Sequence, residues 1–290
     1  MSSTAPATQH PAPRRRKFGL GAYIAATPFA LLVTLFLLAP LAWVVVNAFR
    51  SDSGQFSLAN LSAVFTNAFY FQAMMISLKL SLISSVVGLL VGFQGAYSLY
   101  AIRETRFGQA LVLINSLLSN FSGVPLAFAI MIVFGSAGVV TLLFQAFGIK
   151  LPLDVYSYSG ILISYIYFQI PLAILLLYPA IESLKPEWQE NAFLLGSSFR
   201  GYFVKVAIPV LAPALLGTFI ILFANALGAY ATAYALTNGN FNILPIRISS
   251  LIAGNLTLEP NMAAALALVL VSLMMMMTLI HQYLLRRYRE

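Results

Sequence analysis

The stretch QENAFLLGSSFRGYFVKVAIPVLAP, residues 189–213, interrupts a strongly apolar sequence with polar, charged and glycine residues. Of the 290 residues, 60% are hydrophobic and only 8% are charged. Soluble proteins usually have about a quarter of their residues charged. Since a helix needs roughly 20 mostly apolar residues to cross a bilayer, the composition is typical of a polytopic membrane protein, and the quoted stretch lies between two of its apolar runs.

The apolar runs predict an all-α bundle of six transmembrane helices, at residues 20–48, 74–101, 109–134, 159–181, 212–236 and 262–285. We expect three regions: a disordered basic cytoplasmic tail at 1–19, a first helix and outer loop at 20–73, and a five-helix core at 74–290. The apolar run at 18–49 is too long for the middle of a signal peptide, which favours an uncleaved first helix. Because the chain contains no cysteine, disulfides and thiolate metal sites are excluded.

The basic residues are distributed asymmetrically about these spans. With a cytoplasmic N-terminus, those on the inside are Arg14, Arg15, Arg16, Lys17, Arg103, Arg106, Lys185, Arg200, Lys205, Arg286, Arg287 and Arg289. Only Arg50, Lys150 and Arg247 fall clearly outside. This positive-inside bias predicts that both termini are cytoplasmic. The net charge of +8 therefore reports topology and does not indicate a nucleic-acid partner.

The second span has small residues three or four positions apart, which place them on one helix face. They are Ser81, Ser84, Ser85, Gly88, Gly92, Gly95 and Ala96. Such a face lets a neighbouring backbone approach closely, so we expect helix packing, with a role in lining a pathway as the alternative. Pro125 and Pro171 are expected to kink the third and fourth spans.

The inner segment at 182–211 predicts two short surface helices joined by a tight turn. The first has a proline and acidic residues in its early turns, and Gly196 can take the left-handed conformation that ends it. Ser197 or Ser198 can cap the second helix, and Pro209 and Pro213 are expected to close the segment at the next membrane entry.

The second helix should present Phe199, Tyr202 and Phe203 as aromatic anchors, beside the charged residues Glu190 and Arg200. Exposed aromatic residues with a charged rim are typical of a helix that docks into another protein's groove. The alternative is a helix pair that lies on the lipid surface without a partner.

The same segment resembles the EAA loop of binding-protein-dependent ABC importer permeases. Glu190-Asn191-Ala192, three residues, Gly196, nine residues and then Val206-Ala207-Ile208-Pro209 match the family pattern in spacing, although Asn191 departs from the usual alanine. The resemblance covers residues 74–290 and includes GAYSLYAIRETRFG at 95–108. It implies the helical bundle of a type I ABC importer permease, located in the cell inner membrane.

By this resemblance, the segment couples the membrane helices to a cytoplasmic ABC ATPase dimer. The residues implied in coupling are Glu190, Ala192, Gly196, Phe199 and Pro209. The chain has no G-x-x-x-x-G-K-[ST] sequence, so we expect no catalytic residue, metal site or cofactor of its own, with ATP and Mg²⁺ bound by the partner ATPase. Gly196→Asp should strain the turn and abolish uptake while leaving the protein in the membrane.

The resemblance also implies an extracytoplasmic solute-binding protein and a second permease chain, which we expect to be a homologous but different subunit. Candidate pathway residues in the fifth span are Asn225, Tyr230, Thr232 and Tyr234, although ordinary interhelical hydrogen bonding is the alternative for each. The sequence is most similar to permeases for polyamines, ferric iron, thiamine and phosphonates. Because no acidic residue lies within a predicted span, we favour a small polar or anionic cargo, such as a phosphonate-like compound or ferric iron, over a polyamine.

Two other classes remain as alternatives. An ion-coupled secondary transporter or a channel could share the bundle, but an ion-coupled carrier usually has intramembrane acidic residues or broken helices. A membrane enzyme would need polar catalytic groups at membrane depth. His10 lies in the tail, His281 lies near the inner end of the last span, and no G-x-S-x-G nucleophile sequence is present.

Overall fold

The computed structural model describes residues 20–51, 53–149, 153–254 and 258–289, so the predicted tail at 1–19 lies outside the described residues. Within these ranges the chain is helical, without β-strands. It divides into two compact units, Met1–Val44 and Val45–Glu290. In the first unit, α1 (Leu20–Val33) is followed by a π-helical turn, Thr34–Leu38, and by α2 (Ala39–Ala48), which continues into the second unit.

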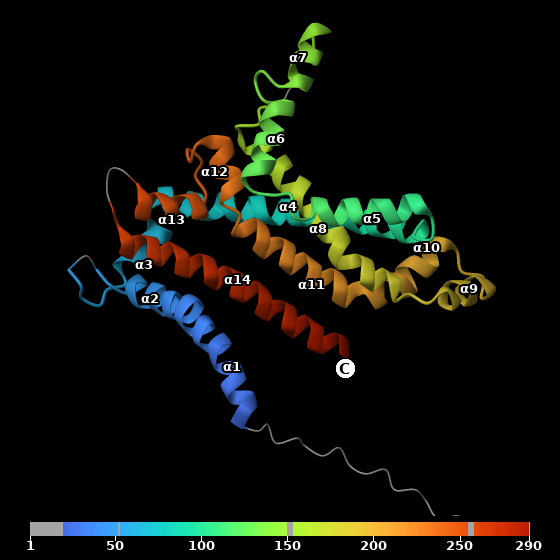
Figure 1. Cartoon of the computed structure of the whole chain (residues 1–290), viewed down its shortest axis with the longest axis horizontal. Helices are drawn as coiled ribbons and strands as arrows, with labels where there is room; N and C mark the ends of the chain where they lie inside the picture. The colour runs from blue at the N-terminus through green and yellow to red at the C-terminus, as the bar shows by residue number, and fades with distance from the viewer. Residues whose placement is uncertain (1–19, 52, 150–152, 255–257, 290) are drawn as a thin grey trace, which may run out of the picture. The chain divides into compact units, whose positions relative to one another are not determined.

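The second unit contains the remaining helices (Figure 1). They are α3 (Ala59–Thr66), α4 (Ala68–Ala101), α5 (Arg106–Leu118), α6 (Val124–Phe134), α7 (Val139–Ala146), α8 (Tyr158–Glu182), α9 (Pro186–Leu194), α10 (Phe199–Tyr202), α11 (Ile208–Leu227), α12 (Ala231–Thr237), α13 (Leu244–Ala253) and α14 (Pro260–Arg289). A second π-helical turn, Phe203–Ala207, joins α10 to α11.

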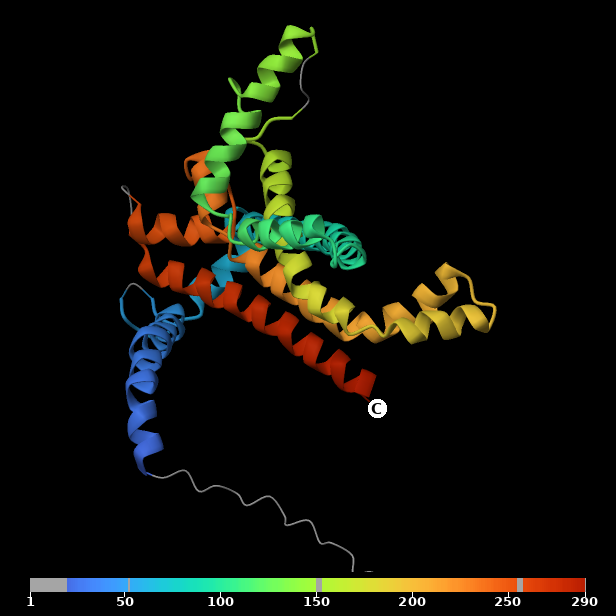
Figure 2. The ribbon, with the colours of Figure 1, turned by 45° about the vertical axis from the view of Figure 1, so that its right-hand side comes forward.

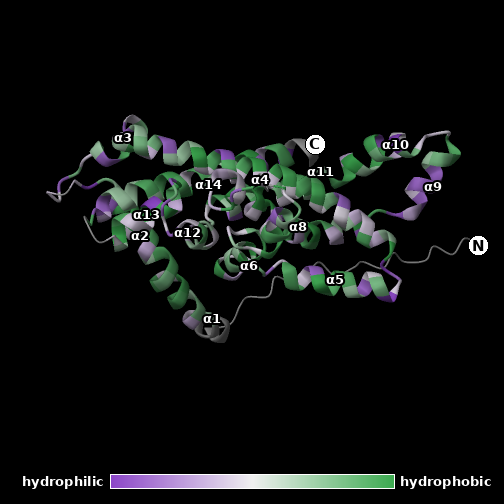
Figure 3. Cartoon of the chain, turned by 90° about the horizontal axis from the view of Figure 1, so that it is seen from above, coloured by the Kyte–Doolittle hydropathy of each residue, from purple (hydrophilic) through white to green (hydrophobic). Residues whose placement is uncertain are grey.

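Six helical stretches of the described residues are long and apolar enough to cross a membrane. They are Ala26–Ala48, Ala68–Ala101, Val124–Ala146, Tyr158–Glu182, Phe199–Thr237 and Pro260–Arg286. Hydrophobic residues dominate the long helices, and hydrophilic residues are conspicuous on α9 (Figure 3). The predicted all-α membrane bundle with six spans is confirmed, and the chain is a multi-pass membrane protein.

Two predicted spans are not continuous helices. The third, predicted at 109–134, breaks between α5 and α6, where Gly123 has a φ of 71° and Pro125 lies in the first turn of α6. Pro125 therefore lies at the start of a helix and does not kink one, because a residue in the first turn donates no intrahelical hydrogen bond that a proline could remove. The fifth span, predicted at 212–236, breaks after α11 at 228–230.

The centre of the second unit is the packing of α4 against α8. A Cβ atom added to Gly92 would lie 2.4 Å from the Cβ of Ala173, and one added to Gly88 would lie 2.6 Å from the Cβ of Gln169. The Gln169 side chain, itself fully buried, donates from Nε2 to Ser85 Oγ at 3.0 Å. The small residues of the second span thus allow close helix packing, as predicted, and this part of the face is not open to a pathway.

We predict that Gly92→Ala will destabilise the protein by about 1–3 kcal/mol, because the new methyl group would meet the backbone-fixed Cβ of Ala173. The matched control is Gly95→Ala on the same helix, whose Cβ would meet only Cδ1 and Cγ1 of the Ile174 side chain, which can rotate away. Thermal unfolding of the two variants in one detergent compares them directly. Equal melting temperatures for both variants would contradict this account of the α4–α8 interface.

Candidate functional site

The predicted helix–turn–helix segment is present, at one end of the second unit and remote from α13 (Figures 1 and 2). Pro186 and Glu187 lie in the first turn of α9, where a missing N–H is harmless and a negative charge is stabilising. At the other end of α9, Gly196 has a φ of 78°. Its N–H donates to Phe193 O and the Ser197 N–H donates to Ala192 O, both at 2.9 Å. This is the hydrogen-bond pattern of a Schellman motif, so Gly196 ends the helix as predicted.

The second helix begins as predicted but does not end where the sequence places it. Ser198 caps α10 by accepting a hydrogen bond from the Gly201 N–H at 3.2 Å. The chain then continues through the π-helical turn into α11 without a loop, and Pro209 lies in the first turn of α11. The expected closure of the segment by Pro209 and Pro213 is therefore wrong, because Pro213 lies inside α11, while the extent of the inner segment to residue 211 stays a prediction.

The aromatic side chains of α10 do not all face outward as expected. Tyr202 is only 3% exposed, and the Phe203 ring lies 5.7 Å from the rings of both Phe93 and Tyr97 on α4. The Phe199 ring stacks on Phe203 at 5.9 Å and remains half exposed. Because α10 continues into α11, most of its aromatic face packs on the bundle, so the expectation of three exposed anchors is wrong for Tyr202 and Phe203.

The most exposed apolar residues of this segment are Leu194 and Leu195, which are 85% and 88% exposed. Sequence reasoning missed these two leucines. Their position directly before the helix-ending glycine is a signal that could have found them, because a helix of only nine residues can bury few apolar side chains. Glu190 is exposed on the same helix, and Ala192 is half-buried. Beside this tip lies an apolar groove of about 350 Å³, lined by Trp188, Asn191, Ala192, Leu195, Val206 and Val210.

The candidate pathway residues cluster around the break between α11 and α12, except for Asn225, which is exposed on α11. The break is held by hydrogen bonds from other elements. The Tyr165 hydroxyl of α8 donates to Ala229 O at 2.5 Å, and Thr232 Oγ1 donates to Gly123 O at 3.2 Å. Thr232 is only 2% exposed, so the structure gives it a packing contact between the two broken spans.

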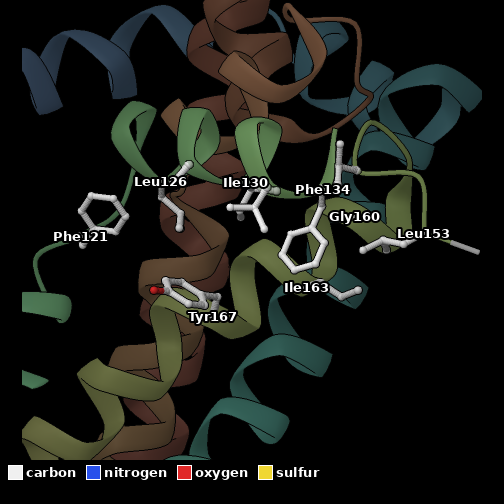
Figure 4. Close-up of a pocket in the computed structure, with 11 residues that line it drawn as sticks. Phe121, Leu126, Ile130, Phe134, Leu153, Gly160, Ile163 and Tyr167 are labelled. Atoms are coloured by element: carbon white, nitrogen blue, oxygen red, sulfur yellow. The ribbon is translucent and has the colours of Figure 1, made fainter. Parts of the chain in front are cut away.

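The rings of Tyr230 and Tyr234 pack against each other in a tilted arrangement, with centroids 5.0 Å apart and an angle of 31° between their planes. Tyr234 borders an open cavity of about 800 Å³ between α6 and α12. A second, smaller cavity of about 150 Å³ lies between α6 and α8, and its labelled side chains are hydrocarbon apart from the Tyr167 hydroxyl (Figure 4). Of these two cavities, the larger one presents several polar groups to a solute. Among the described residues, no three His, Cys, Asp or Glu side chains are grouped to hold a metal ion.

No family model matches the sequence, but relatives with assigned roles are found. The ferric transport system permease protein FbpB of Actinobacillus pleuropneumoniae is 26% identical over 244 residues, which cover 82% of this chain and 34% of the relative. The thiamine transport system permease protein ThiP of Brucella abortus is 29% identical over 164 residues, 54% of this chain and 29% of the relative. The chain thus spans about a third of the length of these relatives.

Solved structures show the same fold. A bacterial ABC transporter involved in the import of the acidic polysaccharide alginate matches with a TM-score of 0.74 at 17% identity, over 92% of this chain and 95% of the other. The MetNI methionine ABC transporter matches with a TM-score of 0.56 at 14% identity, over 75% of this chain and 95% of the other. The resemblance to ABC importer permeases is thereby confirmed, and the chain has the fold of the membrane subunits of these transporters.

Proposed function

We propose that this chain is the permease subunit of an ATP-driven ABC importer, coupled to a separate ATPase through α9 and α10. The observation that carries the proposal is the exposed tip of α9, which presents Leu194 and Leu195 beside Glu190 at one end of a bundle with this fold. Exposed apolar side chains with a charged neighbour are suited to docking in a protein groove. The permease roles of the ferric and thiamine relatives support the same function.

The proposal assigns the remaining parts of the importer to other chains. An ABC ATPase dimer would bind ATP and Mg²⁺, because this sequence lacks the phosphate-binding P-loop pattern. A second permease, homologous but different, would complete the translocation pathway, and an extracytoplasmic binding protein would deliver a small polar solute. The positive-inside distribution supports an inner-membrane location with both termini in the cytoplasm.

The proposal predicts that the tagged protein, purified gently from its native membrane, will bring a stoichiometric ATPase with it. Mass spectrometry identifies the partners, and a second permease in the same sample would establish a heteromeric pathway. Because the chain has no cysteine, Glu190→Cys supplies a single site for a bifunctional crosslinker. Leu258→Cys, exposed just before α14, is the matched control.

Capture of the ATPase by Glu190→Cys and not by Leu258→Cys is the expected result. If the chain purifies alone and neither cysteine captures an ATPase, the α9–α10 pair is a lipid-surface element and the proposal fails. ATP-independent uptake into vesicles would instead favour the ion-coupled transporter.

A further inference from the structure

The cavity of about 800 Å³ between α6 and α12 has a distinctive set of lining residues. They are Val124, Phe128, Met131, Tyr156, Tyr234, Ala235, Leu236, Thr237, Asn238 and Asn240. The lining combines aromatic rings and carboxamides, and none of these residues is charged. Its volume lies within the range of small-molecule sites, which are mostly apolar with a few placed polar groups.

Tyr234 is held in place before any solute arrives. Its ring packs in a tilted arrangement against the ring of Tyr230, whose hydroxyl accepts a hydrogen bond from Ser249 Oγ at 3.1 Å. Gly239, with a φ of 76°, lies so close that an added Cβ would be 2.7 Å from Cε2 of Tyr234. Tyr234 is nevertheless 45% exposed. A fixed ring with an accessible surface binds at low entropic cost, because little rotamer freedom remains to be lost.

The turn after α12 supplies the carboxamides. Asn238 is left-handed, with a φ of 50°, the one non-glycine residue with positive φ in the part of the chain that the structure describes. Asn240 follows after Gly239, and its N–H donates to Thr237 O at 2.9 Å. Both asparagine side chains are exposed. Left-handed asparagines often occur at turns, and such backbone positions persist where the surrounding structure fixes them.

The absence of charged side chains from the lining bears on the class of solute. No Lys, Arg or His lines this cavity, so an oxyanion that leaves water would have only the carboxamide N–H groups and the hydroxyls as donors, with no cation to offset its charge. A planar ring, by contrast, can stack on an aromatic face, and a positively charged ring gains a further attraction to it. The lining therefore does not favour the anionic cargo expected from the sequence.

We propose that this cavity is a cargo subsite for a planar, polar ring compound, neutral or singly cationic. The ring stacks on Tyr234, and its polar substituents bond to Asn238 and Asn240. This inference rests on the proposed permease function and names the substrate class of its pathway.

Saturation-transfer NMR on the full chain in lipid nanodiscs tests the inference, since it detects the weak binding expected of a permease. The probes are nicotinamide, its N-methylated pyridinium cation and methylphosphonate. Both ring probes should give signals, and methylphosphonate should give none. Tyr234→Leu should weaken ring binding about threefold to tenfold, whereas Tyr234→Phe keeps the ring face and should leave it unchanged. Tyr283→Leu, an exposed tyrosine on α14, is the matched control.

A second variant keeps the test decisive if Tyr234→Leu does not fold. Asn240→Cys places a single thiol at the cavity in a chain without cysteine, and maleimide labelling should then abolish the ring signals. Labelled Tyr283→Cys should keep them. Methylphosphonate signals equal to those of the rings, or ring signals indifferent to Tyr234→Leu and to the label at position 240, would overturn the inference.

These measurements need no ATPase, so their failure is distinguishable from failure of the permease function. Ring binding without ATPase capture would reject the proposed function and keep the site. ATPase capture without ring binding would reject the cargo subsite and keep the proposed permease function.

Discussion

Replacing Gly196 with valine is expected to stop ATP-driven movement of the permease while leaving the protein in the membrane. Gly196 has a φ of 78°, and an added Cβ would meet nothing within 4 Å, so backbone strain alone acts there. A left-handed L-residue costs roughly 1–2 kcal/mol, and a β-branched side chain is among the least tolerant. The strain should open the Schellman turn and misplace the tip of α9.

This geometry corrects the expectation for Gly196→Asp. Asp and Asn tolerate the left-handed region better than most residues, so aspartate strains the turn less than valine does and is not expected to abolish uptake through strain. Gly196→Asn should retain coupling, and it serves as the conservative variant. Gly54→Val is the matched strain control, because Gly54 has a φ of 80° and equally open surroundings in a distant loop.

Movement can be measured without knowing the cargo. Spin labels on single cysteines at Leu90 and Ile221, both exposed, report the distance between α4 and α11 in the complex with its ATPase. We expect this distance to change on ATP binding in the parent and in Gly54→Val, but not in Gly196→Val. An unaltered ATP-dependent change in Gly196→Val would refute the coupling role of this turn.

The double replacement Leu194→Asp and Leu195→Asp is expected to separate the permease from its ATPase. Both side chains are more than four-fifths exposed in the isolated chain, so the change should cost little folding stability. Central apolar contacts of a protein interface often contribute at least 2 kcal/mol each, and losing one such contact weakens binding by about thirtyfold.

Co-purification of the ATPase, quantified against the amount of permease, measures this loss. Leu258→Asp is the control, since Leu258 is 66% exposed and lies outside the α9–α10 segment. Full ATPase recovery with the double variant would show that the tip of α9 is not the docking surface. The groove beside Trp188 would then become the next surface to test.

The sequence was sufficient for the features that follow from local rules. Apolar length predicted the six spans, and the glycine, serine and proline chemistry of the inner segment predicted α9, its end at Gly196 and the Ser198 cap. The assigned roles of Glu190, Ala192 and Phe199 in coupling stay predictions, as do those of Asn225 and Tyr230 in the pathway.

Features that depend on tertiary contacts could not be predicted. Gly228 is a local signal for the break at 228–230, but no local rule predicts that the Ala229 carbonyl is satisfied by the Tyr165 hydroxyl, 64 residues away. The inward direction of Tyr202 likewise depends on how α10 continues into α11. With two spans broken, the argument against an ion-coupled carrier now rests on the missing intramembrane acidic residues and no longer on unbroken helices.

The loop-free junction between α10 and α11 would let the proposed permease transmit a displacement along one helix. From Phe199 to Leu227 the helical backbone runs without a loop, over roughly 40 Å at 1.5 Å per residue, and it includes the π-helical turn and Pro213. A flexible tether would absorb a displacement at the tip of α9, whereas a continuous rod carries it to the far end. The helix is first interrupted at the break at 228–230, four residues before Tyr234, which borders the larger cavity. Work done at one surface of the membrane would thus be delivered where the solute is proposed to bind.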